Sequence, residues 1–208
     1  MTTKEKKEKT LNKERFISIL NDTGRDGITY VIDELESLGF FEAPASSNHH
    51  LNEPGGLLKH SLNVYDEAMM FREHLISTRP EIESYLPADS VAISCLLHDV
   101  CKAEIYQRSV RSRKLIDGSW EKYDAYEINH SAFPCGHGEK SAIQLLRWGL
   151  DLTEDEILAI RWHMGAWDLA FQSFEQKGCL DKAKDTTPLL CLLILADEAS
   201  TNLIESRL

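Results

Sequence analysis

The chain has 208 residues, of which 42% are hydrophobic, and a formal net charge of −11 at pH 7. This length is typical of one domain or at most two, and the apolar fraction is sufficient for a core. The negative charge disfavours binding to long nucleic acid through a basic face. No apolar run is long enough to span a membrane, since the longest extends from Leu189 to Ala196. The five cysteines form no CxxC pair and are odd in number, which indicates reduced thiols and a cytoplasmic protein.

The first part of the chain is predicted to be scaffold. Residues 1–10 mix lysine and glutamate without an apolar core, which excludes a signal peptide and predicts a disordered tail. Apolar residues at helical spacing predict helices over 12–20 and 28–38, the second with Asp26 as N-cap and Gly39 as C-cap. Residues 43–56 are rich in Pro, Gly and Ser and are predicted to form a loop. His49 and His50 lie in this loop, where a histidine is most often simply solvated.

The next helix is predicted over 57–75, and His60 falls on its apolar stripe. A further helix is predicted from Val91 to Lys102, with Asp89 or Ser90 as its cap. It ends in the sequence His98-Asp99-Val100-Cys101-Lys102. An ionised carboxylate at the end of so apolar a run needs a partner, because burying an unpaired charge is costly.

A His-Asp doublet supplies one nitrogen and one oxygen ligand, a combination that suits Mn, Fe, Co, Ni or Zn. Lys102 lies one helical turn beyond His98, where its ammonium group suits a phosphate oxygen. A solvated lysine favoured by the helix dipole is the equally simple interpretation of Lys102 taken alone.

Residues 105–130 depart from helical periodicity and predict a β-hairpin with an Asp117-Gly118 turn. The first arm carries four cations in an otherwise acidic protein. This basic cluster has two interpretations, a solvated charged face or a flap that guides phosphate groups. Its members are Arg108, Arg111, Arg113 and Lys114.

Three more candidate residues lie in the C-terminal half. His137 stands between two glycines before a helix predicted over 141–149, a place with backbone freedom and little apolar packing. A capping box, Thr153-Glu154-Asp155-Glu156, predicts a helix over 157–164 with His163 near its inward face. The last helix, with Thr187 as cap and Pro188 at its first position, is apolar nearly all round and is therefore expected in the core. Asp197 near its end then needs a partner. Residues 167–185 show no clear pattern.

These elements together supply four histidines and two carboxylates. Each histidine taken alone is consistent with a core residue bonded to a backbone carbonyl, but the whole set exceeds the needs of one closed tetrahedral zinc site. It therefore favours an open catalytic site, or two ions bridged by a carboxylate. The six candidate ligands are His60, His98, Asp99, His137, His163 and Asp197.

The order His60, His98-Asp99, Asp197 resembles the HD superfamily of metal-dependent phosphohydrolases. The chain is similar to the two-metal subset of that superfamily, because His137 and His163 lie between the other ligands and Lys102 matches the pattern HDxxK. This subset includes HD-GYP-type phosphodiesterases and the HD domain of a bacterial 3′-5′ exoribonuclease family. No GYP sequence follows His163 and no nucleic-acid-binding barrel precedes the HD motif, so neither cyclic di-GMP specificity nor processive RNA degradation is expected.

The resemblance implies an all-α fold, a helical HD bundle with a small β-hairpin insertion and an N-terminal helical extension. The single HD domain would occupy 11–208, with N-terminal helices over 11–40 and the HD core over 55–203. His60, His98, Asp99 and Asp197 would hold one divalent transition metal. A second ion would be held by His137 and His163, with Asp99 as the bridge; the resemblance does not distinguish one ion from two, nor Mn, Fe, Zn, Ni and Co.

The implied activity is hydrolysis of a phosphodiester or phosphomonoester in a small nucleotide-like substrate by a metal-activated hydroxide. Asp99 and Lys102 would be catalytic, and Glu139 and Asp168 are candidates for the general acid. Two alternatives stay open: a nucleotide-binding regulatory HD module without turnover, and a mononuclear nucleotidase in which His137 and His163 contact phosphate. No membrane partner is expected, and the oligomeric state is left open.

Overall fold

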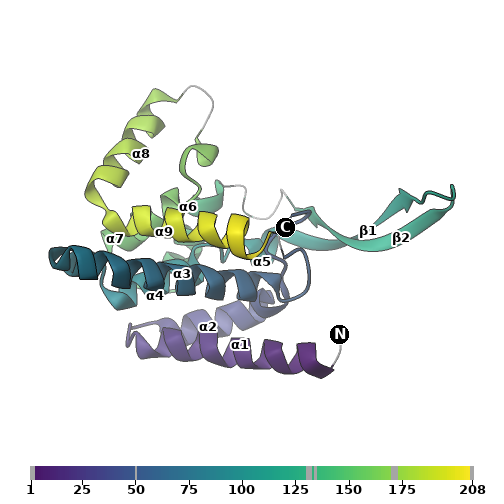
Figure 1. The fold of residues 1–208 in the computed structure, drawn as a ribbon, viewed down its shortest axis with the longest axis horizontal. Helices are drawn as coiled ribbons and strands as arrows, with labels where there is room; N and C mark the ends of the chain where they lie inside the picture. The colour runs from purple at the N-terminus through teal and green to yellow at the C-terminus, as the bar shows by residue number, and fades with distance from the viewer. Residues whose placement is uncertain (1–2, 50, 130–132, 134, 170–172, 207–208) are drawn as a thin grey trace.

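The structure is a computed structural model that describes residues 3–49, 51–129, 133, 135–169 and 173–206. Helices dominate these residues, and the one sheet found among them is a two-stranded antiparallel hairpin (Figure 1). The predicted all-α fold with a small hairpin is thus confirmed. In chain order the elements are α1 (Thr3–Asp22), α2 (Ile28–Leu38), η1 (Phe40–Glu42), α3 (Gly56–Thr78), η2 (Pro80–Tyr85), α4 (Ala88–Leu97), α5 (Lys102–Ile105), β1 (Tyr106–Lys114), β2 (Trp120–Ile128), α6 (His137–Arg147), α7 (Glu154–Trp162), η3 (Gly165–Asp168), α8 (Phe174–Thr186), α9 (Pro188–Ala199) and the π-helical turn η4 (Ser200–Ile204).

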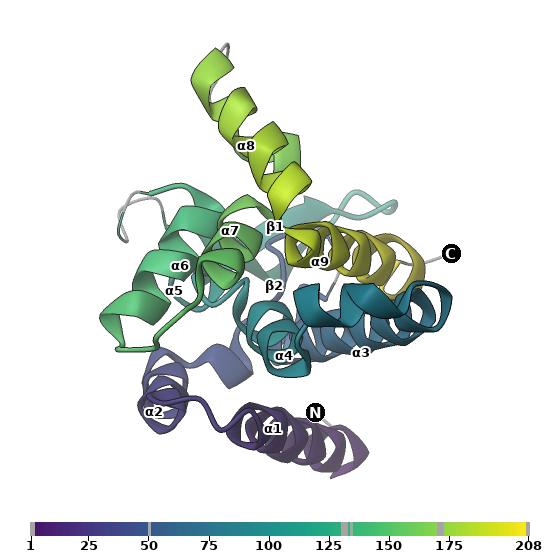
Figure 2. The ribbon, with the colours of Figure 1, turned by 90° about the vertical axis from the view of Figure 1, so that its left-hand side faces the viewer.

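The helices α1 and α2 form a layer beneath α3 and α4, as both views show (Figures 1 and 2). Phe16 and Leu20 of α1 are fully buried in this layer against Phe40 and other apolar side chains. The helix begins at Thr3, whereas residues 1–10 were predicted to be disordered. Lysine and glutamate are good helix formers, and ion pairs from Lys9 to Glu42 and from Lys13 to Glu36 fasten α1 to the elements that follow.

The central helix α4 contacts α1, α3, α7 and α9, and its residues from Ser90 to Leu97 are all buried. The predicted helix from Val91 to Lys102 is wrong at its end, because α4 stops at Leu97 and α5 starts at Lys102. Between them the backbone is held by bonds to the residue three positions earlier, such as Lys102 N to Asp99 O at 2.9 Å. This tighter turning separates the HD doublet from α4.

The predicted side-chain caps at two helix starts are also wrong. Gly27, with φ of 88°, precedes α2 in place of Asp26, and Pro87 precedes α4 with no capping side chain. Asp89 instead accepts a hydrogen bond from Arg25. The predicted C-cap at Gly39, with φ of 74°, and the capping box from Thr153 to Glu156 are both confirmed.

In the C-terminal half, α6 begins at His137, four residues before its predicted start. Residues 167–185 were predicted without a clear pattern, but they include the end of η3 and nearly all of the helix α8, which projects from the body (Figure 2). The predicted all-round burial of α9 is wrong, since Cys191 and Leu195 are exposed on one face. Thr187 does not cap α9 with its side chain; its hydroxyl donates to Asp155.

The hairpin β1–β2 extends away from the helices (Figure 1), with Tyr106 opposite Ile128 at its base and Lys114 opposite Trp120 at its tip. Among the described residues, no single helix has both the length and the apolar character needed to cross a membrane. The α8 helix and the segment Pro188–Ile204 meet that criterion only as a pair, and they are bent by 100° relative to each other.

Candidate metal centre

The structure brings all six predicted ligand residues to one place from five parts of the fold. His60 comes from α3, the HD doublet follows α4, His137 begins α6, His163 follows α7 and Asp197 lies near the end of α9. His60, His98, Asp99 and His163 are buried.

The Asp99 carboxylate lies at the centre of this group. Its Oδ1 is 2.5 Å from Nε2 of His137 and 3.5 Å from Nε2 of His163. Its Oδ2 is 3.3 Å from Nε2 of His98 and 3.4 Å from Nε2 of His60. His60 also lies 3.3 Å from Oδ1 of Asp197. Each of the four imidazoles thus turns its Nε2 toward the Asp99 carboxylate, the arrangement expected of a carboxylate that two ions share.

Two histidines show which ring nitrogen is free to bind an ion. Nδ1 of His98 lies 2.9 Å from the Cys95 carbonyl oxygen, and Nδ1 of His163 lies 2.7 Å from that of Ile160. A carbonyl oxygen only accepts, so Nδ1 carries the hydrogen, and in the neutral ring Nε2 keeps its lone pair. Both Nε2 atoms are buried and form no hydrogen bond within the described part of the chain.

The ends of α4 and α7 explain this orientation. A helix leaves its last carbonyl groups without an intrahelical partner. Each imidazole follows the helix directly and bonds the carbonyl three residues before it, which turns the opposite nitrogen toward Asp99. His98 and His163 therefore owe their direction to the backbone rather than to another side chain.

The donor atoms fit divalent ions. The six residues form three overlapping sets of three. Within each set, one ligand atom from each residue lies within 4.8 Å of the other two. Imidazole nitrogen and carboxylate oxygen suit transition metals such as Zn and Fe. The sets are His60 with His98 and Asp99, His98 with His163 and Asp197, and Asp99 with His137 and His163.

Charge at the centre is balanced by Lys102, whose Nζ lies 2.6 Å from Oδ2 of Asp99. Burial alone would raise the pKa of Asp99, but the nearby Lys102 and His98 outweigh it and hold that pKa well below its ordinary value. Burial would likewise lower the pKa of Lys102, and Asp99 reverses this and raises it. Both groups are therefore charged at neutral pH, which a metal ligand and a phosphate-binding lysine require.

Glu205 is a residue that the sequence analysis missed. Its carboxylate is buried, with Oε1 and Oε2 at 3.1 and 3.2 Å from Nδ1 of His60. Asn63 donates to the same carboxylate at 2.9 Å. Glu205 directly follows η4, and π-helical turns are frequent at functional sites because they redirect side chains. His60 is thus oriented by a carboxylate, where His98 and His163 use the backbone.

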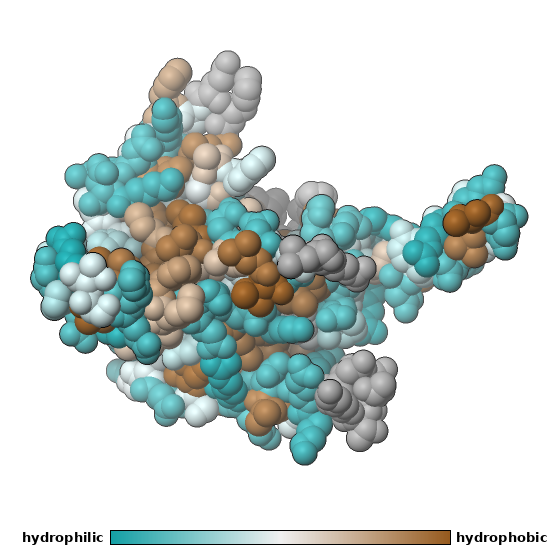
Figure 3. All heavy atoms as spheres, viewed as in Figure 1, coloured by the Kyte–Doolittle hydropathy of each residue, from teal (hydrophilic) through white to brown (hydrophobic). Residues whose placement is uncertain are grey.

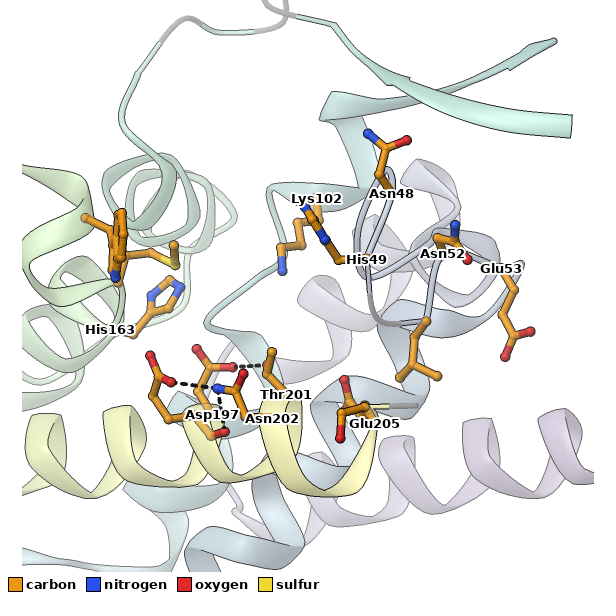
Figure 4. Close-up of a pocket in the computed structure, with 15 residues that line it drawn as sticks. Asn48, His49, Asn52, Glu53, Lys102, His163, Asp197, Thr201, Asn202 and Glu205 are labelled. Atoms are coloured by element: carbon orange, nitrogen blue, oxygen red, sulfur yellow. Dashed lines mark hydrogen bonds between the residues drawn. The ribbon is translucent and has the colours of Figure 1, made fainter. Parts of the chain in front are cut away.

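A cavity of about 1000 Å³ opens onto this centre (Figure 4). Lys102, His163 and Asp197 form its inner end, and the facing wall is formed by Asn48, His49, Leu51, Asn52 and Glu53. Trp167 also lines it and is 87% exposed. His49, which was predicted to be simply solvated, belongs to this wall, and His50 lies outside the described residues.

The basic hairpin contacts one of the residues that line the cavity. Arg111 donates to Asn48 Oδ1 at 2.8 Å, whereas Arg113 pairs with Glu121 on the opposite strand. The hairpin extends away from the helices (Figure 1), and its role as a flap that guides phosphate groups stays a prediction.

The two candidates for the general acid share one partner. Arg161 contacts Glu139 at 2.6 Å and Asp168 at 2.5 Å. Burial raises the pKa of Glu139, but hydrogen bonds from Cys135 and the charge of Arg161 lower it overall. This ion pair keeps Glu139 ionised and disfavours it as a proton donor.

One curated relative shares part of the sequence. The chain is 31% identical over 90 residues to dihydroneopterin 2′,3′-cyclic phosphate phosphodiesterase of Methanocaldococcus jannaschii. The match covers 43% of this chain and 32% of the relative, so the chain spans about a third of that protein. No protein-family model and no solved structure matches the chain.

Proposed function

We propose that this protein is an HD-type metal-dependent phosphodiesterase acting on a small nucleotide-like substrate. The observation that carries the proposal is the pair of buried Nε2 atoms of His98 and His163, which both face Asp99 and form no hydrogen bond to any described residue. Burying polar atoms without partners is costly, so their retention at one point favours an ion as the partner. The partial match to a phosphodiesterase is consistent with this chemistry.

We expect the six ligands to form two groups, one for each ion, that share Asp99. His60, His98 and Asp197 would hold one ion, His137 and His163 the other, and Asp99 would contact both. Such ions, when bound, activate water as a nucleophile and stabilise the charge that develops on phosphoryl oxygens.

Lys102 adds a fixed positive charge at the inner end of the cavity. Its Nζ now contacts Asp99, and we expect it to bind a non-bridging phosphate oxygen of the substrate. The ammonium group would then lower the energy of the transition state more than that of the ground state, because negative charge accumulates on the phosphate oxygens during the reaction.

The lining of the cavity favours a substrate with a planar ring system. Trp167 offers an exposed aromatic side chain, and the amides of Asn48, Asn52 and Asn202 also line the cavity. Aromatic side chains stack on heterocyclic bases of any identity. The relative is named as a phosphodiesterase of dihydroneopterin 2′,3′-cyclic phosphate.

The proposal is tested with purified protein of measured metal content. We expect hydrolysis of an aryl phosphodiester and of 2′,3′-cyclic nucleotides after reconstitution with Mn²⁺, Fe²⁺ or Zn²⁺, and loss of activity with a chelator. An Asp99→Asn variant should fold and yet lose turnover by at least about a hundredfold, whereas Asp33→Asn, exposed on α2, should match the wild type.

Unchanged turnover in Asp99→Asn would refute the proposed chemistry. Thermal stabilisation by metal and nucleotide with no product from any substrate would instead favour the regulatory binding module. A content of one metal per chain, with full activity, would favour the mononuclear nucleotidase.

A further inference from the structure

The hairpin β1–β2 presents apolar side chains that nothing in the described chain covers. Val110 is 64% exposed, Trp120 is 70% exposed, and Ile116 in the turn is fully exposed. Apolar atoms also show at the outer end of the hairpin in the space-filling view (Figure 3). An isolated two-stranded hairpin is only marginally stable in water, so a projecting one needs further contacts.

The outer edge of β2 is available for such contacts, and the hydrogen bonds of the hairpin show which of its backbone groups point outward. Hydrogen bonds from Asn129 N to Ile105 O and from Leu115 N to Ser119 O join odd-numbered residues at the two ends of the hairpin. In an antiparallel pair these bonded positions alternate with unbonded ones. The backbone groups of even-numbered residues in β2, among them Lys122 and Asp124, therefore point away from β1.

Charge distinguishes the two edges. The β1 strand carries four cations and no carboxylate, so two copies of β1 would repel each other. The β2 strand carries both signs, and its exposed Lys122 and Asp124 have no ion partner within the described part of the chain. Two copies of β2 running antiparallel, with a two-fold axis at Tyr123, place Lys122 of each copy opposite Asp124 of the other.

We propose that β2 pairs with β2 of a second copy of this chain, which joins the two hairpins into a four-stranded sheet. The outward backbone groups of Lys122 and Asp124 meet in this register as bonded pairs. Moving the two-fold axis by one residue, to Lys122 or to Asp124, places that charged residue opposite its own copy. The same surface serves both copies, so the assembly closes as a dimer.

Pairing is confined to the outer part of β2. Near the base of the hairpin, the Tyr126 carbonyl oxygen already accepts a hydrogen bond from Arg111 at 3.4 Å. Tyr126 itself is buried against the body of the protein. In the proposed register residues 122–124 of each copy therefore carry the interface, through the outward backbone groups and the charged side chains of Lys122 and Asp124.

The test measures mass in solution by sedimentation equilibrium for the wild type, Lys122→Glu, Asp124→Lys and the double variant. We expect a wild-type dimer, and a dimer dissociation constant raised about tenfold or more in each single variant, since both symmetry-related pairs become like-charged. The double variant restores opposite charges and should dimerise again. Glu73→Lys on exposed α3 is the matched control and should behave as wild type.

A wild-type protein that stays monomeric up to about 100 µM would overturn the proposal. A dimer that is indifferent to both single reversals would overturn it as well, because the interface would then lie elsewhere. Circular dichroism of each variant shows whether it has folded.

Discussion

Replacing Glu205 with glutamine removes one negative charge behind His60 and retains the shape of the side chain. In the structure both carboxylate oxygens lie within 3.2 Å of Nδ1 of His60, and Asn63 holds one of them in place. A charged acceptor on Nδ1 makes the opposite nitrogen a better metal ligand and fixes the direction of the ring. The variant therefore tests whether His60 binds an ion at all.

The expected loss follows from the kind of hydrogen bond that is weakened. Hydrogen bonds to a charged group are about twice as strong as neutral ones, and losing such an outer partner typically costs about 10- to 100-fold in metal affinity. This range corresponds to about 1.4–2.8 kcal/mol. We expect Glu205→Gln near the lower limit, because its amide oxygen still accepts from Nδ1, and Glu205→Ala near the upper one.

Metal affinity is measured by competition with a chromogenic chelator, starting from metal-free protein, so the readout does not depend on turnover. Glu73→Gln on exposed α3 removes the same charge far from the site and is the control. An affinity within about twofold of wild type in Glu205→Ala, with the fold intact, would refute the role assigned to both Glu205 and His60.

Three further substitutions and one binding measurement have defined outcomes. Lys102→Met should lower kcat about 100-fold or more and leave metal content unchanged, measured by kinetics and elemental analysis. Trp167→Ala should raise KM for a cyclic nucleotide by the factor that corresponds to about 1–3 kcal/mol of lost stacking energy, with a smaller effect on kcat. Arg25→Ala should destabilise the protein by about 3–5 kcal/mol in chemical denaturation, because buried Glu156 loses its two bonds of 2.8 and 2.9 Å; the exposed Arg79→Ala should not. Burial lowers the pKa of His137, but Cys101 and Asp99 outweigh it and raise the pKa to about 10, so metal binding at pH 7.5 should release a proton, seen by calorimetry in buffers of different ionisation enthalpy.

The sign of the pH dependence follows from the same value. The folded pKa of His137 lies above its ordinary value of 6.5. In metal-free protein its protonated form thus stabilises the fold fully below pH 6.5, and this contribution is lost as the pH rises through about 10. Metal affinity should change in the opposite direction, rising over the same interval, because only neutral imidazole binds the ion. A metal affinity that falls from pH 6.5 to 9 would contradict this assignment.

The sequence by itself determined most of the elements and the identity of the convergent side chains. The Asp117-Gly118 turn and the capping box at Thr153 are local signals, and both were found where predicted. Helical periodicity located most of the helices but missed α8, and it misplaced the end of α4. His60, Asp99 and Asp197 stood out because polar residues in apolar runs are costly unless they meet a partner. That cost depends on neighbouring residues in the chain, so it can be recognised without a structure.

Only the tertiary structure decided what surrounds those side chains. Glu205 sits in a polar stretch where a glutamate is unremarkable, and only η4 brings it behind His60. Arg25 lies in a short connection, yet it ties α7 to Asp89 of α4 through contacts 131 and 64 residues away. Trp167 is a candidate for substrate binding only because the structure places it in the lining of the cavity. Such roles arise from packing between distant segments, which leaves no periodic trace in the sequence because each residue type is ordinary in its local setting.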